Sequence, residues 1–116
     1  MKKLARLMAF VMAAVLPLQV FAFECNVKIN YLLVYSHGDV NVHHTGRNYF
    51  TVICNINNTY QGVSPTTCAM WTALLLGVKK RNAMATFYWG REGSCATLPT
   101  YGEAPVPSYI GEMPGP

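Results

Sequence analysis

The stretch "GVSPTTCAMW", residues 62–71, carries the start of a helix and a cysteine in its first turn. Ser64 is a favoured N-cap residue, and Pro65 suits the first helical position because the amide hydrogen that it lacks would have no partner there. Apolar side chains then recur at helical spacing, namely Cys68, Trp71, Leu75 and Val78, widened by Leu74 and Leu76. We therefore predict one helix that packs its apolar face on a sheet.

Three segments before this helix have the composition of β-strands. Residues 27–35 are rich in β-branched and aromatic side chains, "SHGD" forms a tight turn, and residues 40–45 alternate apolar and polar side chains. A third strand is predicted over residues 49–56, with Phe50, Val52, Cys54 and Ile56 on one face. These segments predict a three-stranded meander.

Beyond the helix, residues 83–89 ("AMATFYW") predict a fourth strand. Residues 99–116 are rich in proline and glycine, and we expect an irregular tail with a short edge strand near residues 108–110. The predicted fold is mainly β with one α-helix (α+β). Its order is that of a small OB-like antiparallel barrel, in a single domain over residues 23–98.

The first 22 residues predict a secretory signal peptide. They have a basic start, an apolar run from Leu7 to Leu18, and small residues Val20 and Ala22 before a cleavage site. The apolar run is too short to span a bilayer. We expect a mature chain that begins at Phe23 and is periplasmic or extracellular, and an uncleaved N-terminal anchor is the alternative.

The charge balance argues against a polyanionic partner. The full chain has a formal net charge of +4, but without residues 1–22 it keeps six cationic and five anionic side chains, a net charge near +1. A nucleic-acid or membrane partner would need a basic face. The one cluster, "KKR" at residues 79–81, complements the dipole at the helix C-terminus. We predict no nucleic-acid partner and no membrane insertion after cleavage.

Four cysteines remain after cleavage, and their number alone allows three disulfide connectivities. Cys54 ends the third strand and Cys68 opens the helix, so this pair would close a loop of about 15 residues and stabilise the fold by about 3 kcal/mol. Cys25 begins the first strand and Cys95 follows the fourth, so this pair meets if the two strands are antiparallel neighbours. Cys68 is therefore predicted to be a disulfide partner and not a nucleophile.

The polar residues offer no arrangement for catalysis. The carboxylates are scattered, and His43 and His44 are adjacent on a strand, so their side chains point to opposite faces and cannot chelate one metal ion. His37 lies in a turn. Ser64 lacks the glycine-flanked elbow of a nucleophilic serine. We predict no enzymatic activity, no metal site and no cofactor.

Several segments resemble the pentamer-forming B subunits of bacterial AB toxins of the subtilase-cytotoxin and typhoid-toxin type. They are "YSHGDVNV", "YFTVICNI", "GVSPTTCAMWTALLLGVKKRNAMATFYW" and "LPTY". The chain is also similar to small exported bacterial proteins of unknown function. The toxin resemblance implies an OB fold that binds host glycans. The serine that those subunits use near the start of the first strand has no counterpart in residues 25–28.

The predicted function is a secreted binding module for a glycan or protein ligand. Exposed-aromatic candidates are Tyr49, Tyr60, Tyr101 and Tyr109, and Arg47 beside Tyr49 is the polar ligand contact that we predict. The alternative is a periplasmic inhibitor or immunity-like partner protein that uses the proline-rich tail or a loop as its contact. An enzyme with an unrecognised site and a homo-oligomeric state both stay open.

Overall fold

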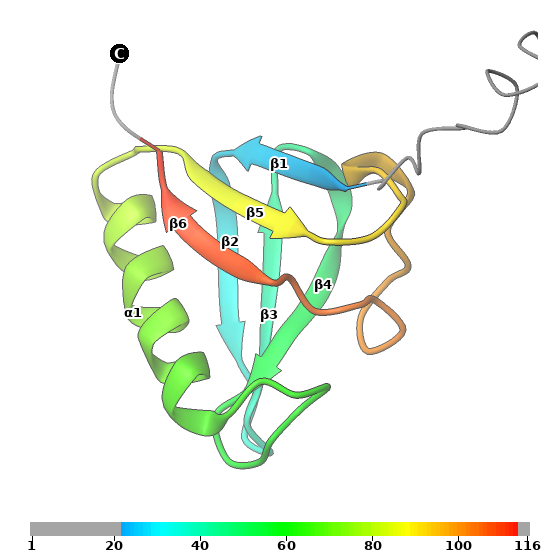
Figure 1. The fold of residues 1–116 in the computed structure, drawn as a ribbon. Helices are drawn as coiled ribbons and strands as arrows, with labels where there is room; N and C mark the ends of the chain where they lie inside the picture. Colours follow the sequence, from blue (N-terminus) through cyan, green and yellow to red (C-terminus); the bar gives the residue numbers. More distant parts are fainter. Residues whose placement is uncertain (1–21, 114–116) are drawn as a thin grey trace, which may run out of the picture.

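The computed structural model describes residues 22–113, so the predicted signal peptide lies outside the described residues except for its last residue. The elements are β1 (Phe23–Val27), β2 (Ile29–Val34), β3 (Asp39–His44), β4 (Arg47–Asn55), α1 (Pro65–Lys80), β5 (Ala85–Trp89), the short 3-10 helix η2 (Cys95–Thr97) and β6 (Tyr109–Glu112). The strands form two antiparallel three-stranded sheets, β1–β5–β6 and β2–β3–β4 (Figure 1). A mainly β fold with one helix is confirmed. None of the described helices is long and apolar enough to cross a bilayer.

The single strand predicted over residues 27–35 is wrong, because the chain forms two strands that belong to different sheets. β1 pairs with β5, and β2 pairs with β3. The break lies at Lys28, whose backbone N–H donates to Thr45 Oγ1 at 3.1 Å and whose carbonyl accepts from the Thr45 N–H at 3.0 Å. These two bonds to a turn residue hold Lys28 outside the strand pairing.

A closed barrel would require a further pairing between β4 and β6. The sheets join through Lys28, which leaves β4 and β6 as the outer strands of the combined order β6–β5–β1, β2–β3–β4. Within residues 22–113, neither sheet is closed by hydrogen bonds between those two strands. Helix α1 contacts β2, β4 and β6, so it packs against both sheets at one side of the molecule (Figure 1).

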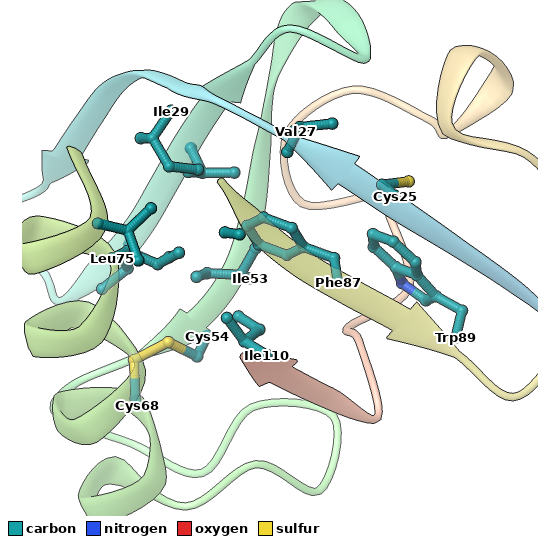
Figure 2. Close-up of a cluster of buried hydrophobic side chains, with 14 of the residues drawn as sticks. Cys25, Val27, Ile29, Ile53, Cys54, Cys68, Leu75, Phe87, Trp89 and Ile110 are labelled. Carbon is teal, nitrogen blue, oxygen red and sulfur yellow. A yellow bond between two sulfur atoms is a disulfide. The ribbon is translucent and has the colours of Figure 1, made fainter. Parts of the chain in front are cut away.

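The core lies between the two sheets and under the helix. Figure 2 shows Phe87 and Trp89 of β5 packed near Ile53 of β4, with Leu75 of α1 on one side. All four side chains are essentially inaccessible to solvent. Burying an apolar side chain of this size stabilises a fold by about 1.5–3 kcal/mol, so this cluster is the main reason that the sheets stay together.

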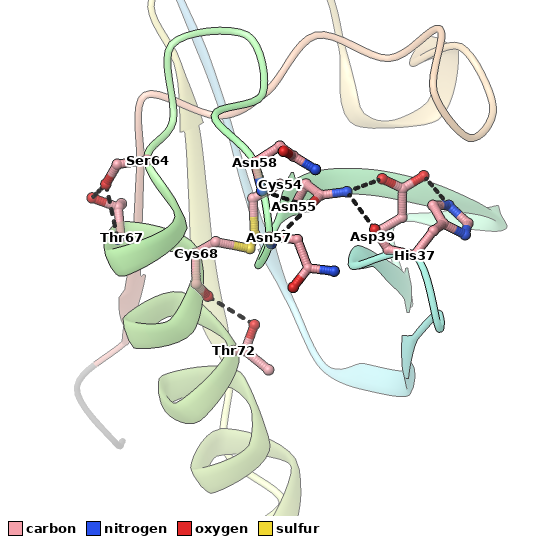
Figure 3. Close-up of a disulfide and its surroundings, with 10 residues drawn as sticks. All are labelled: His37, Asp39, Cys54, Asn55, Asn57, Asn58, Ser64, Thr67, Cys68 and Thr72. Atoms are coloured by element: carbon pink, nitrogen blue, oxygen red, sulfur yellow. Dashed lines mark hydrogen bonds and ion pairs between the residues drawn. A yellow bond between two sulfur atoms is a disulfide. The ribbon is translucent and has the colours of Figure 1, made fainter.

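The helix and both disulfides form as predicted. Ser64 Oγ accepts the Thr67 N–H at 3.1 Å and Pro65 is the first helical residue. Cys54 is bonded to Cys68, and Cys25 to Cys95, with Cα–Cα distances of 5.5 and 5.8 Å. Figure 3 shows the first bridge joining the end of β4 to the first turns of α1. Leu76, predicted to widen the apolar stripe, is exposed instead.

The predicted facing of β4 is wrong beyond Val52. Val52 lies opposite Asn41, but Cys54 lies opposite Val40, so β4 has one residue more than β3 at this point. Such a bulge reverses the alternation of side chains. Phe50 therefore lies on the outer face of the sheet, whereas Cys54 points into the core.

The described part of the tail runs back along both sheets. The Tyr101 N–H donates to Phe50 O at 2.9 Å, and the Val52 N–H donates to Tyr101 O at 3.3 Å, so the tail lies beside β4. Further on, Ala104 is fully buried, and the edge strand expected near residues 108–110 is present as β6, paired with β5. Tyr101 is thereby placed next to the outer face of β2–β3–β4.

Candidate functional site

The outer face of the β2–β3–β4 sheet turns away from the core. Val40 and Val42 of β3 belong to the core, so alternation along the strand directs Asn41 and His43 to the opposite side. Val52, which pairs with Asn41, is buried but lies outside the continuous core. In Figure 1 the β1–β5–β6 sheet lies in front of the β2–β3–β4 sheet, so the outer face of β2–β3–β4 is turned away from the viewer.

Four aromatic side chains cross this face from strand to strand, and we call Tyr31, His43, Phe50 and Tyr101 the aromatic row. The ring centroids lie 5.6 Å apart for Tyr31 and His43, 5.3 Å for His43 and Phe50, and 6.3 Å for Phe50 and Tyr101. The last two rings are nearly parallel, at 13°. Each distance lies within the range of aromatic contact, so the rings support one another.

The two ends of the aromatic row are open to solvent. Tyr31 is 59% exposed and Tyr101 is 49% exposed. Aromatic rings bury a large area when a partner covers them, and exposed groups of apolar side chains often mark binding surfaces. The aromatic row can therefore stack against a ligand that has an apolar face.

His43 is fixed in the aromatic row by two amides. Its Nδ1 lies 3.1 Å from Asn30 Nδ2, and its Nε2 lies 3.3 Å from Asn48 Oδ1. A neutral imidazole protonated on Nε2 satisfies both bonds, because it accepts from Asn30 and donates to Asn48. Both ring nitrogens are thus engaged, which suits a positioned contact surface better than a proton-transferring group.

A shallow pocket of about 190 Å³ adjoins the aromatic row at the β3–β4 turn. It shares His43 with the row and is lined by Asn30, His43, His44, Thr45, Gly46, Arg47 and Asn48. The lining offers amide and hydroxyl groups together with one guanidinium group. Groups of this kind, few in number and placed beside an apolar surface, fix the orientation of a bound ligand.

The predicted pair Arg47 and Tyr49 does come together. The guanidinium carbon of Arg47 lies 5.4 Å from the centre of the Tyr49 ring, and Tyr49 is strongly exposed. Arg47 also donates from Nη1 to Pro99 O at 2.7 Å. Arg47 therefore ties the β3–β4 turn to the start of the tail while it lines the pocket.

The four tyrosines predicted as candidates do not form one site. Tyr101 belongs to the aromatic row, and Tyr49 lies beside Arg47. Tyr60 donates its hydroxyl to Gly102 O at 3.0 Å, which holds the loop after β4 against the tail. Tyr109 stacks on Tyr88 in the other sheet, with the ring centroids 4.8 Å apart.

Gln61 holds the tail segment that carries Tyr101. Its Nε2 donates to Ala104 O at 3.1 Å, and its Oε1 accepts the Val106 N–H at 3.3 Å. Gln61 itself has a φ of 47°, in the left-handed region that few residues other than glycine adopt. The loop after β4 and the tail are therefore joined through one side chain.

His44 points away from the aromatic row, as the alternation predicts. It is 3% exposed, its ring lies 5.5 Å from that of Phe87, and its Nδ1 accepts the Gly46 N–H at 3.1 Å. Burial, and then the neighbouring charges of His43 and Arg47, lower the pKa of His44 from its ordinary value of 6.5 to about 4. His44 is therefore a neutral part of the core that supports the β3–β4 turn.

At the other end of the face, Asp39 forms an ion pair with His37 at 2.9 Å and accepts a hydrogen bond from Asn55 at 2.9 Å (Figure 3). Burial alone raises the pKa of Asp39, but the bonds from Asn55 and His37 and the charge of His37 outweigh it and hold the pKa below 3.8. This network closes the turn between β2 and β3.

Across residues 22–113, no three His, Cys, Asp or Glu side chains gather as a metal site would require.

A second hollow, of about 210 Å³, lies between Phe23 and the loop after β5. Its charged lining groups are Arg91, Glu92 and Glu103, all exposed. Phe23 is the one aromatic residue in its lining; the rings stacked behind Phe23, those of Trp89 and Phe87, are buried, and the lining has no asparagine or glutamine. The outer face of β2–β3–β4 is therefore the better candidate site.

Sequence reasoning missed most of this site. The sequence pattern identifies Tyr31 and Phe50 only as strand residues, and it presents His43 only as a candidate metal ligand or catalytic group. Asparagine is depleted in strands, yet Asn30, Asn41 and Asn48 all lie within strands. Asparagines that recur in strands next to aromatic residues are the signal that could have indicated this face.

No protein-family model matches the chain, and no curated protein or solved structure matches it. The resemblance to toxin B subunits therefore stays a prediction.

Proposed function

We propose that the protein is an exported binding module that recognises a glycan on the outer face of β2–β3–β4 and performs no catalysis. The observation that carries this proposal is the aromatic row joined through His43 to an amide-lined pocket. A pyranose ring has an apolar face of C–H groups and a rim of hydroxyl groups. Tyr31, Phe50 and Tyr101 would stack on the apolar face, and Asn30 and Asn48 would bind hydroxyl groups at the rim.

An OB-like architecture would suit this ligand, because OB folds bind oligosaccharides on a strand face. The strand order supports it, since a meander is followed by a helix and by a strand that returns beside the first. In this proposal the two sheets are the halves of an OB-like barrel that is open between β4 and β6. The resemblance to glycan-binding toxin B subunits supports the same class of ligand.

Export is the second part of the proposal. Both disulfides favour an oxidising compartment, periplasmic or extracellular. Cleavage of the predicted signal peptide would leave Phe23 at the start of β1, where its ring stacks on Trp89 with the centroids 4.8 Å apart. Protein recovered from the periplasm of a bacterial host should have the intact mass of a chain that begins at Phe23.

A homo-oligomer is the third part. β2 lies at the edge of its sheet, and its end exposes Leu33 and Val34, with Tyr35 exposed just beyond it. The stretch from Ile29 to Tyr35 contains no charged residue and no proline. An uncharged apolar edge strand readily pairs with another strand, and a second copy of this chain would supply one. Light scattering of the purified protein tests this state.

The test of glycan recognition is a glycan-array screen of the mature protein, followed by titration of a bound glycan. Tyr101→Ala should weaken binding about tenfold, because it removes a stacking ring worth about 1 kcal/mol together with its buried area. Tyr109→Ala is a matched control: both tyrosines are 49% exposed, but Tyr109 lies on the other sheet. Equal losses in the two variants would contradict the proposed site.

A parallel pull-down with the mature protein addresses the alternative function. Capture of a protein in the absence of any bound glycan would favour the inhibitor or immunity-like partner. Turnover of a glycan in the same experiments would overturn the proposal of a non-catalytic module. If turnover occurs, His43→Ala tests whether it depends on His43. We expect no such dependence, because both ring nitrogens of His43 are hydrogen-bonded to amides.

A further inference from the structure

Asn41 lies at the centre of the outer face, on the middle strand of the sheet. Its register partners are Leu33 on β2 and Val52 on β4. His43 of the aromatic row follows two residues later on the same face. Despite its place on an outer face, Asn41 is only 1% exposed. Its register partners on both flanking strands are apolar.

The side-chain oxygen of Asn41 lacks the partner that a buried acceptor needs. Its Oδ1 is buried and has no hydrogen-bond partner within residues 22–113. Asn55, also buried, differs in this respect. It donates to His37 O and Asp39 Oδ1 and accepts the N–H groups of Asn57 and Asn58. An unsatisfied buried amide destabilises a fold, so an apolar residue would serve the unliganded protein better at position 41.

We infer that Asn41 determines the specificity of the glycan site by hydrogen-bonding one hydroxyl group of a neutral pyranose that is stacked on the aromatic row. This inference rests on the proposed function and adds the chemistry that the ligand must have. Tyr31 and Phe50 are the diagonal neighbours of Asn41 on the two flanking strands, within reach of long side chains. A sugar stacked on the row therefore places a rim hydroxyl above Asn41.

The unpaired oxygen selects the kind of group that binds it. A carboxylate has no proton to donate, so it cannot satisfy Asn41 Oδ1. A hydroxyl group has a proton that it can donate to this oxygen. Leu33, the register partner of Asn41 on β2, is 39% exposed, and exposed side chains change rotamer within nanoseconds, so a change of rotamer at Leu33 would open the way to Asn41.

The test compares Asn41→Leu with the wild-type protein in two measurements. The probes are the methyl glycosides of glucose, galactose and mannose and their monodeoxy analogues, titrated by calorimetry. Wild type should bind one parent glycoside at least about tenfold more tightly than one of its deoxy analogues. Asn41→Leu should bind both equally, at the affinity of the deoxy analogue.

The second measurement is urea unfolding without sugar. Asn41→Leu should raise the midpoint by about 0.5 M, because an apolar group of similar volume replaces an unsatisfied amide. Asn55→Leu is the matched control and should lower the midpoint, because it breaks a satisfied network. Opposite shifts of the urea midpoint in the two variants would distinguish Asn41, an amide that serves binding, from Asn55, an amide that stabilises the fold.

The outcomes distinguish the two proposals. If neither the glycan array nor any glycoside shows binding to wild type, the proposed function fails and the inference fails with it. If a glycan on the array binds but none of the glycosides does, only the inference fails. If glycosides bind and Tyr101→Ala weakens them, but Asn41→Leu keeps the preference for the hydroxyl group, only the inference fails. A lowered midpoint for Asn41→Leu would also overturn it, since Asn41 would then be structural.

Discussion

The stability of the protein should fall as the pH is lowered from about 7 to about 4, and buried His44 is the main cause. Its pKa in the folded state is about 4, against an ordinary value of 6.5. Between these values the unfolded chain binds a proton at His44 and the folded chain does not, so stability rises with pH through this window. This difference in pKa lowers the free energy of unfolding by about 2 kcal/mol near pH 5, and by about 3 kcal/mol once the pH is below both pKa values.

Asp39 acts in a lower window. Its pKa is held below 3.8, so the stability that it contributes is present above that value and is lost only as the pH falls through its folded pKa. The range from about pH 4 to about pH 6.5 therefore reports mainly on His44. Urea unfolding followed by tryptophan fluorescence measures the free energy of unfolding at each pH.

The variant His44→Asn separates this effect from the rest of the protein. Its carboxamide oxygen can still accept the Gly46 N–H, which His44 Nδ1 accepts at 3.1 Å, but it does not titrate. The variant should be less stable than wild type at pH 7 because it loses the ring beside Phe87. Its stability should then stay nearly constant down to about pH 4. The same decline in both proteins would refute the assignment to His44.

Two further predictions concern the start of the helix. Ser64→Ala should cost about 1 kcal/mol in urea unfolding, because it removes the oxygen that accepts the Thr67 N–H, whereas exposed Thr66→Ala should cost nothing. Replacing Cys54 and Cys68 together by alanine should cost about 3 kcal/mol, since the bridge closes a loop with a sequence separation of 14 residues; an unchanged urea midpoint would contradict the pairing.

The helix and the bridges could be predicted because their signals are local or depend only on the order of elements. Ser64 and Pro65 specify a helix start by their own chemistry. The pairing of Cys25 with Cys95 requires only that the first and fourth predicted strands be antiparallel neighbours, and β1 and β5 are such neighbours. The break at Lys28 could not be predicted, because it depends on bonds to Thr45 in a turn 17 residues away.

The aromatic row could not be predicted for a related reason. Simple alternation predicts Phe50 on the same face as Cys54, and the bulge between Val52 and Cys54 reverses that relation. Tyr101 was recognised as an exposed aromatic residue, but its place beside Phe50 depends on how the tail lies along β4. Both features arise from tertiary packing, which alternation within a single strand does not encode.

The side-chain amide of Gln61 couples the position of Tyr101, at one end of the aromatic row, to the conformation of the loop after β4. Because it grips Ala104 O and the Val106 N–H, any change in the length or shape of that loop is passed to the tail and to Tyr101. In an alanine scan, replacement of Gln61 should therefore weaken ligand binding as replacement of Tyr101 does, although the Gln61 amide bonds only to backbone groups of the tail. Affinity in such a chain can evolve in the loop while every ligand-contacting residue stays the same.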